Sequence, residues 1–306
     1  MQGLFFSCGM IVVMNEMMIC LVLGFLGAAM GSFAGAQVWR LRARQLVDDK
    51  KAGEPYDKAE YARLKPLMGK KGPADRSIDL DTGKQLQWYD MIPIISWLVL
   101  RGRSRYSGKF IGWFEFVMEV GVATFFVLSY VYWPYALDSP WLIGQFVVWL
   151  ITGVVMAIQF GYDFKWQLLW TWLSVLVIIL GAVYAGLGMV IAEDLWSALL
   201  SVVGSVVILG GLYFILWWLS RERWVGLGDV ILGTGLGLLL ADWRLAFVAL
   251  IAANLVGTII VAVGAVFGKV SRGQHIAFGP LLIIGAIIAQ LWGRIIIDWY
   301  TGFFLP

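Results

Sequence analysis

Two aspartates, Asp163 and Asp229, stand where hydrophobic segments of the sequence meet polar turns. A carboxylate at the end of a membrane helix is costly to place there, so its default interpretation is functional. Two facing carboxyls share a proton because each disfavours ionisation of the other, and such a pair can hydrolyse a peptide bond. Gly226 and Gly228 precede the second aspartate and would let a substrate backbone approach closely. The same Gly-Leu-Gly-Asp run is also expected where an aspartate caps a helix.

The segments around these aspartates are hydrophobic enough to span a membrane. Hydrophobic residues make up 60% of the 306 residues, and the mean hydropathy is +0.81. Repeated apolar runs of about 18 residues or more predict transmembrane helices. We therefore expect an all-α polytopic membrane protein with about eight transmembrane helices, at residues 17–39, 111–132, 141–160, 168–191, 195–219, 229–241, 245–267 and 276–297.

Basic residues are distributed unevenly between these segments. If residues 40–109 are cytoplasmic, 21 of the 23 lysines and arginines fall on the cytoplasmic side. The positive-inside rule then sets the orientation of the chain. This orientation places both Asp163 and Asp229 at the cytoplasmic face, where two neighbouring helices would bring them together.

The one sizeable polar segment, residues 40–110, is expected to form a small cytoplasmic loop subdomain. It separates an N-terminal region with the first span (1–39) from a seven-span core (111–306). The only cysteines are Cys8 and Cys20, which excludes a disulfide framework and a cysteine-based metal site. Since no basic stretch precedes the first apolar run, we expect that span to be retained and not cleaved as a signal peptide.

Several short motifs occur in the order in which one known family carries them. They lie at residues 31–33, 38–41, 88–97, 101–108, 163–171, 226–229 and 277–280. Each motif is weak alone, but together they resemble the prepilin peptidases, which are membrane aspartyl proteases of type IV pilus and type II secretion systems.

The resemblance implies a bifunctional enzyme of the bacterial inner membrane. Asp163 and Asp229 would cleave the leader from a type IV prepilin or pseudopilin at the cytoplasmic face. The new N-terminus would then be methylated with S-adenosylmethionine beside the polar loop, with Gly102, Asp90 and Glu119 as candidate methyltransferase or supporting residues. The implied partners are the pilin precursor and membrane lipid, and not nucleic acid.

The loop departs from the family in one respect that bears on cofactors. Many family members hold zinc there with two CxxC pairs, whereas Ser104 and Ser107 stand at the second pair and the first pair is missing from residues 76–87. Hydroxyls do not replace thiolate ligands. We therefore expect no structural metal. Met91 also replaces the usual Asn, which weakens the case for methyl transfer.

Other interpretations stay open at this stage. An ion- or proton-coupled transporter would use Asp163 and Asp229 as relay carboxylates, although no inverted repeat is visible. A non-catalytic assembly factor would not need the pair. Glycine-rich stretches at 24–35 and 204–211 predict close helix packing. Glu115 and Glu119 share a helix face, and we expect at least one of them to pair with a basic loop residue.

Overall fold

The computed structural model describes residues 2–68, 77–268 and 277–304 of the chain. Within these ranges its regular structure is helical, without a strand, and isolated bridges join Ile78 to Gln85 and Arg103 to Phe110. The chain divides into two compact units, Met1–Tyr130 and Val131–Pro306. The expectation of an all-α fold is thus confirmed.

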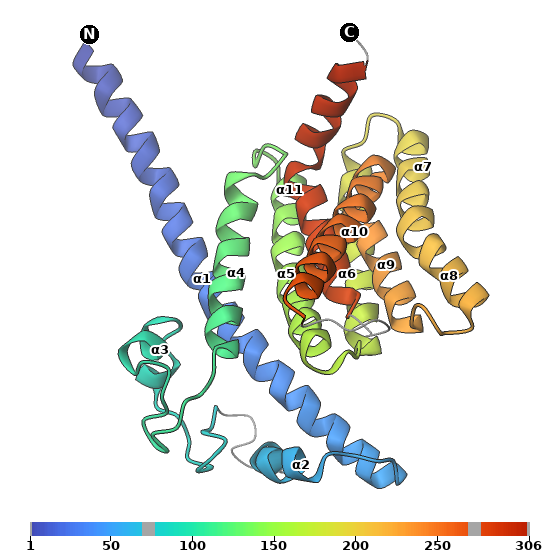
Figure 1. Cartoon of the computed structure of the whole chain (residues 1–306). Coiled ribbons are helices and arrows are strands. Elements are labelled where there is room, and N and C mark those ends of the chain that lie inside the picture. Colours follow the sequence, from blue (N-terminus) through green and yellow to red (C-terminus); the bar gives the residue numbers. More distant parts are fainter. Residues whose placement is uncertain (1, 69–76, 269–276, 305–306) are drawn as a thin grey trace. The chain divides into compact units, whose positions relative to one another are not determined.

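Seven helical segments among the described residues are long and apolar enough to cross a membrane. Their helices are α1 (Gln2–Ala52), α4 (Phe114–Val131), α5 (Pro140–Trp166), α6 (Thr171–Val190), α7 (Leu195–Val206) continued by α8 (Leu212–Ser220), α10 (Trp243–Val266) and α11 (Gly279–Phe304) (Figure 1). Large apolar side chains such as Val147 and Ile251 are exposed on these helices, as lipid-facing positions require. The prediction of a polytopic membrane protein is confirmed.

The sixth expected span corresponds to α9 (Leu227–Leu240), which has 14 residues. A bilayer crossing takes about 20 residues, so α9 is too short to cross a bilayer unaided. The last expected span starts at residue 276, which lies outside the described residues, and its helix is described from Gly279.

In the first unit, α1 and α4 lie side by side (Figure 1) because glycines line their contact. A Cβ placed on Gly27 would be 2.8 Å from the Cα of Ala123, and one on Gly31 would be 2.6 Å from the Cα of Glu119. Only a hydrogen atom fits at these distances. The predicted close packing of the first glycine-rich stretch is therefore confirmed.

Helix α1 does not end near residue 39, where the first span was expected to end, but continues to Ala52. Ala43 and Leu46 on the extension form a small core with Leu64 of α2 (Lys58–Leu64). Arg42 adds an ion pair to Glu60 at 2.6 Å. The polar loop therefore begins as a helix with one buried apolar side.

Among the described residues, the remainder of the loop contains only short elements. They are η1 (Lys65–Leu67), η3 (Trp88–Met91) and α3 (Ile95–Val99). Trp97 on α3 packs its ring against Trp113 and Phe116, with both centroids 4.6 Å away. This aromatic contact joins the loop to the start of α4.

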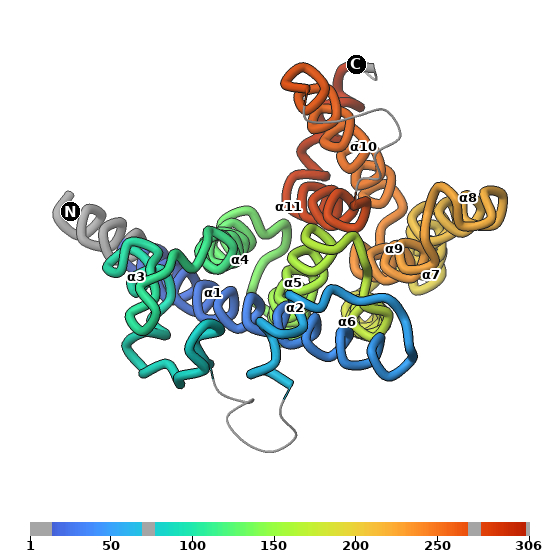
Figure 2. The backbone as a smooth tube through the Cα atoms, turned by 60° about the horizontal axis from the view of Figure 1, so that its bottom comes forward, coloured from blue at the N-terminus to red at the C-terminus, as the bar shows by residue number. Residues whose placement is uncertain are grey.

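In the second unit, α9 packs against α6, α7, α10 and α11, while α5 packs against α6 and α11 (Figure 2). Glycines again permit the close approach: a Cβ on Gly235 of α9 would be 2.9 Å from the backbone nitrogen of Ile178. Between α7 and α8 the chain forms a π-helical segment, η4 (Val207–Gly211), where Gly210 faces Thr234 of α9. The second glycine-rich stretch thus also serves helix packing, as predicted.

Candidate functional site

Asp163 lies in the last turn of α5. The helix ends because Gln167 adopts the left-handed conformation with φ of 55°, and its N–H donates to the carbonyl of Asp163 at 2.8 Å. Asp163 is 3% exposed, its Oδ2 atom is buried, and the backbone N–H of Gly279 donates to its carboxylate. A buried carboxylate with so few hydrogen-bond donors is unusual and points to a role beyond packing.

The loop after α5 is held in place by Gln159, a fully buried side chain on the same helix. Its amide oxygen accepts from the N–H of Trp170 at 3.3 Å, and its amide nitrogen donates to the hydroxyl of Ser174 at 2.5 Å. These bonds tie the start of α6 to α5. The intervening residue Leu169 is thereby held against the aspartate site.

Asp229 occupies the third position of α9, and Gly226 is the N-cap. The Asp229 Oδ2 atom accepts from the N–H of Gly226 at 3.2 Å. Asp229 is therefore not the N-cap itself, but its carboxylate reaches back to the N–H of the N-cap residue, as the acidic residue of a capping box does. This single bond uses one lone pair and leaves the rest of the carboxylate available.

The two aspartates lie within electrostatic range of each other, and a glycine lies beside each carboxylate. Their carboxylates lie close enough to repel each other electrostatically. A Cβ on Gly279 would lie 2.6 Å from Oδ2 of Asp163, and one on Gly228 would lie 2.9 Å from the Cβ of Leu169. A side chain at either glycine would therefore collide with the surroundings of the aspartates.

Aromatic residues complete the surroundings of Asp229. Tyr213 of α8 interacts electrostatically with Asp229, and its ring lies 5.3 Å from that of Phe278. The Tyr213 hydroxyl is buried without a hydrogen-bond partner. Sequence reasoning missed Tyr213 and Leu169, because an isolated tyrosine or leucine within an apolar run carries no chemical signal.

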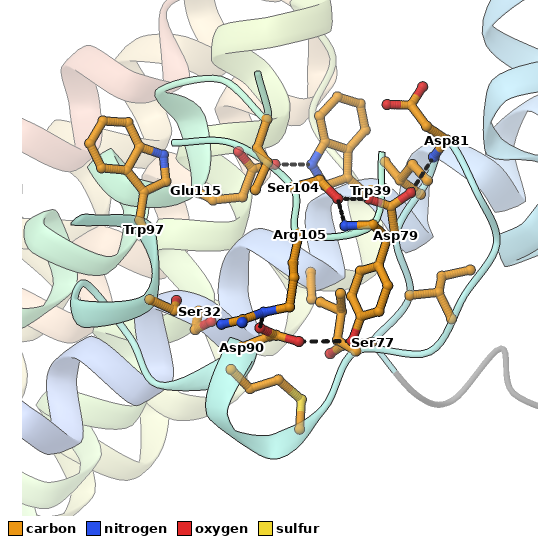
Figure 3. A pocket seen from close by; sticks show the side chains of 18 of the residues that line it. Ser32, Trp39, Ser77, Asp79, Asp81, Asp90, Trp97, Ser104, Arg105 and Glu115 are labelled. Carbon is orange, nitrogen blue, oxygen red and sulfur yellow. Dashed lines mark hydrogen bonds and ion pairs between the residues drawn. The ribbon is translucent and has the colours of Figure 1, made fainter. Parts of the chain in front are cut away.

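A second candidate site is a cavity of about 230 Å³ in the first unit. It opens between the loop and the helices α1 and α4, and Figure 3 shows its lining side chains. Carboxylates and aromatic rings from separate elements contribute to the wall: Trp39, Asp90, Trp97, Glu115 and Glu119. Its volume is somewhat below the range for pockets that bind small molecules, about 300 Å³ and above.

Glu119 and Glu115 connect α4 to other parts of the first unit. Glu119 is 7% exposed and accepts from the N–H of Ile94 at 2.6 Å. Ile94 has φ of 64°, which is a strained conformation for a β-branched residue. Glu115 accepts from Nε1 of Trp39 at 2.9 Å, while its Oε2 is buried without a partner. The described partners are therefore a backbone amide, the hydroxyl of Ser32 and an indole, not the basic residue that we expected.

Asp90 lies at the cavity wall and organises the loop around it. Its carboxylate accepts from Arg105 Nε at 2.9 Å, from the Tyr106 hydroxyl at 2.8 Å and from the backbone N–H of Gln87 at 3.3 Å. The hydrogen bond to Asp90 raises the pKa of the Tyr106 hydroxyl. Asp90 thus holds η3 and the turn after Gly102 together (Figure 3).

Gly102 adopts φ of 69°, a region that glycine enters without cost. A Cβ here would lie 2.7 Å from Phe110 Cε2 and 2.8 Å from Trp97 Cζ2. The structure thus places Asp90 and Glu119 at the cavity wall and Gly102 against the lining residues Trp97 and Phe110. Asp163, Asp229, Gly226 and Gly228 lie in the other unit. Among the described residues no cluster of three or more His, Cys, Asp or Glu side chains is arranged to bind a metal ion.

Comparison with known proteins gives consistent results. Residues 25–133 match the family model described as the Bacterial Peptidase A24 N-terminal domain, and this range resembles the first structural unit. A prepilin leader peptidase/N-methyltransferase of Xanthomonas campestris pv. campestris is 27% identical over 286 residues, which cover 91% of this chain and 93% of the relative. One from Legionella pneumophila is 25% identical over 93% of this chain and 95% of its own length.

A further relative is a type 4 prepilin-like proteins leader peptide-processing enzyme of Escherichia coli, 26% identical over 85% of this chain and 89% of that protein. No solved structure matches the chain. The relatives are enzymes, and nothing in the comparisons or in the site favours a transporter. The family resemblance and the expectation of an enzyme are confirmed.

Proposed function

We propose that this chain, which belongs to the family of prepilin leader peptidases and N-methyltransferases, cleaves the leader of a type IV prepilin or pseudopilin with Asp163 and Asp229 and then methylates the new N-terminus. The observation that supports it most directly is the electrostatic interaction between two carboxylates from α5 and α9, one of which is buried. The neighbouring glycines leave room for an extended peptide.

The peptidase step follows from a shared proton. One aspartate is ionised and removes a proton from a water molecule, while the other is protonated and donates to the carbonyl oxygen of the scissile bond. The water oxygen bonds to the carbonyl carbon. The C–N bond then breaks, and the departing nitrogen takes a proton from the pair. The water supplies both the hydroxyl of the new carboxyl group and a proton for the new amine.

The distribution of charge supports the cytoplasmic face of the inner membrane as the location of this step. Arg221 and Arg223 precede Asp229 in sequence, and Lys165 follows Asp163 by two residues. Basic residues flanking transmembrane helices stay on the cytoplasmic side and contact anionic lipid headgroups. Both aspartates therefore belong to the end of the bundle that faces the cytoplasm.

For methyl transfer, the residues around the first-unit cavity fit S-adenosylmethionine. When bound, this cofactor supplies an electrophilic methyl group on a positively charged sulfur. Glu115, whose Oε2 is buried without a partner, and Glu119 would bind its positive charge. Trp39 and Trp97 offer aromatic faces to the adenine ring or the sulfonium. A carboxylate here would also accept the proton that the pilin amine must lose before it is methylated.

The proposal is tested with detergent-purified protein, a prepilin substrate and S-adenosylmethionine. Mass spectrometry should find the leader removed, usually after a glycine, and the mature N-terminus heavier by one methyl group. An untouched prepilin would refute the peptidase assignment. A trimmed but unmethylated N-terminus, even with excess methyl donor, would refute the methyltransferase assignment alone.

We also expect zinc to be dispensable. Ser104 and Ser107 provide hydroxyls where zinc-binding loops provide thiolates, so the loop should fold without metal. Metal analysis of the purified protein should find no stoichiometric zinc, and a chelator should leave leader cleavage unchanged. One tightly held zinc ion per chain would contradict this prediction.

A further inference from the structure

Two turns in the first unit are built on the same plan, although they are 25 positions apart. One is Asp79-Leu-Asp-Thr-Gly-Lys84 and the other is Ser104-Arg-Tyr-Ser-Gly-Lys109. In each turn the first residue's N–H donates to the carbonyl of the lysine, and the glycine N–H donates back to the carbonyl of the first residue, at 2.8–2.9 Å. Both glycines, Gly83 and Gly108, have φ of 68°.

The side chains repeat the plan as well. Oδ1 of Asp79 accepts from the N–H groups of Asp81 at 3.1 Å and Thr82 at 2.7 Å. The hydroxyl of Ser104 accepts from the N–H groups of Tyr106 and Ser107, both at 3.1 Å. The first side chain of each turn is therefore fixed by the turn's own backbone.

The two turns converge on the Asp79 carboxylate. Ser104 Oγ donates to Oδ2, Ser107 Oγ donates to the same oxygen at 3.4 Å, and Thr82 Oγ1 donates to Oδ1 at 2.8 Å. Figure 3 shows Ser104 and Asp79 facing each other across the two turns. Both residues are buried, each 8% exposed.

We infer that Asp79, Thr82, Ser104 and Ser107 form a metal-free clasp. In this clasp the Asp79 carboxylate holds the two turns together by accepting hydrogen bonds from both, in place of a structural metal ion. The spacing supports this: D-x2-T and S-x2-S place pairs of side chains as two C-x2-C pairs would place four thiolates around zinc. An anion that accepts from several hydroxyl and amide donors is a strong acceptor. The clasp therefore supplies the cross-link that this loop would otherwise take from a metal.

The charge state of Asp79 suits this role. Burial alone would raise the pKa of its carboxyl, but hydrogen bonds from Ser104, Thr82 and the backbone of Asp81 together hold the pKa below its usual value. The side chain is thus ionised at neutral pH and acts only as an acceptor. Every donor that points at it is therefore satisfied.

The clasp also positions the wall of the first-unit cavity. The second turn carries Arg105 and Tyr106, which both bond to Asp90 at that wall. Asp79 is in this sense a positioning residue for the methyl transfer proposed above. This last consequence rests on the proposed function, whereas the clasp itself does not.

The first test removes the carboxylate. Asp79→Ala should increase the rate of tryptic cleavage within the loop of the purified full-length protein by at least about tenfold, because several donors lose their acceptor at once. Asp81→Ala is the matched control: Asp81 lies two residues away, and the described contact of its side chain is an exposed bond to Lys109 at 3.2 Å. Equal rates for the two variants would overturn the inference.

The second test replaces the clasp by a metal. The variant D79C/T82C/S104C/S107C should bind one zinc or cobalt ion per chain, with the absorption of a four-thiolate cobalt site. Its loop should resist trypsin with metal and lose that resistance on chelation. Metal should also restore any methylation that Asp79→Ala loses. Failure to bind metal with four thiolates would show that the side chains do not converge, whatever the protein's activity.

Discussion

Asp163→Asn and Asp229→Asn should each lower the rate of leader cleavage by about 10²–10⁴-fold, the range for loss of a general acid or base. Each substitution removes an ionisable group and keeps the size of the side chain. A shared-proton pair then fails, because one partner can no longer exchange its proton with the other or with water. Cleavage of a purified prepilin, followed by gel or mass spectrometry, measures the effect.

A control separates catalysis from helix capping. Asp194 is the N-cap of α7 and accepts from the N–H groups of Trp196 and Ser197, at 3.0 and 3.2 Å. Asparagine caps helices about as well as aspartate. The Asp194→Asn variant should therefore cleave the prepilin leader at the normal rate. If Asp229→Asn behaved like this control while folded in the membrane, Asp229 would only be a helix-start residue and the assignment of the pair would be wrong.

The membrane helices were accessible from the sequence because hydrophobic length alone determines them. A run such as residues 141–160 is too apolar and too long for a soluble fold, and it lies within α5. The position of Asp163 at the end of that run followed from the same reasoning. The electrostatic interaction of Asp163 with Asp229 could not be predicted from hydrophobic length. It also depends on Gln159, which hydrogen-bonds the chain after α5 back onto that helix, and on Gly279, which has no side chain to collide with the Asp163 carboxylate.

The polar loop was harder to predict because its order comes from specific bonds instead of hydrophobic length. Because charged residues follow Trp39, the continuation of α1 to Ala52 was not predicted. The buried residues on one side of this helix are Val38, Leu41 and Leu46. The first half of the clasp was also missed, because residues 76–87 were compared only with a CxxC pair, which they lack. The repeated pattern of a polar residue, two residues, a hydroxyl residue, glycine and lysine was the available signal.

Glu119 shows why a residue's partner is difficult to infer from a sequence. The shared helix face of Glu115 and Glu119 predicted a basic loop partner for at least one of them, but the Glu119 carboxylate accepts from the amide of Ile94. That amide is free to bond because Ile94 adopts a positive φ at the N-cap of α3, which no propensity would assign to isoleucine. A strained turn of this kind is set by the contacts around it, here with a buried carboxylate that lines a cavity.

Gly102→Ala should abolish methylation of the mature N-terminus, or lower its rate more than about tenfold, while leader cleavage continues. Two effects act together. An L-residue in the left-handed region costs about 1–2 kcal/mol, and the new Cβ would stand 2.7 Å from Phe110 and 2.8 Å from Trp97. Since both rings line the cavity, they must move, and the proposed cofactor pocket changes shape. Cleavage depends on residues of the other unit and should persist.

Gly53→Ala separates the two effects, because it carries the backbone cost alone. Gly53 has φ of 76°, and a Cβ there meets nothing within 4 Å, so this variant carries the backbone cost without displacing an aromatic ring. It should methylate at nearly the normal rate. Both activities are read from one sample by mass spectrometry, which separates precursor, trimmed pilin and methylated pilin. If Gly102→Ala methylates normally, or if Gly53→Ala loses methylation equally, the rings of Trp97 and Phe110 do not shape a methyl-transfer site.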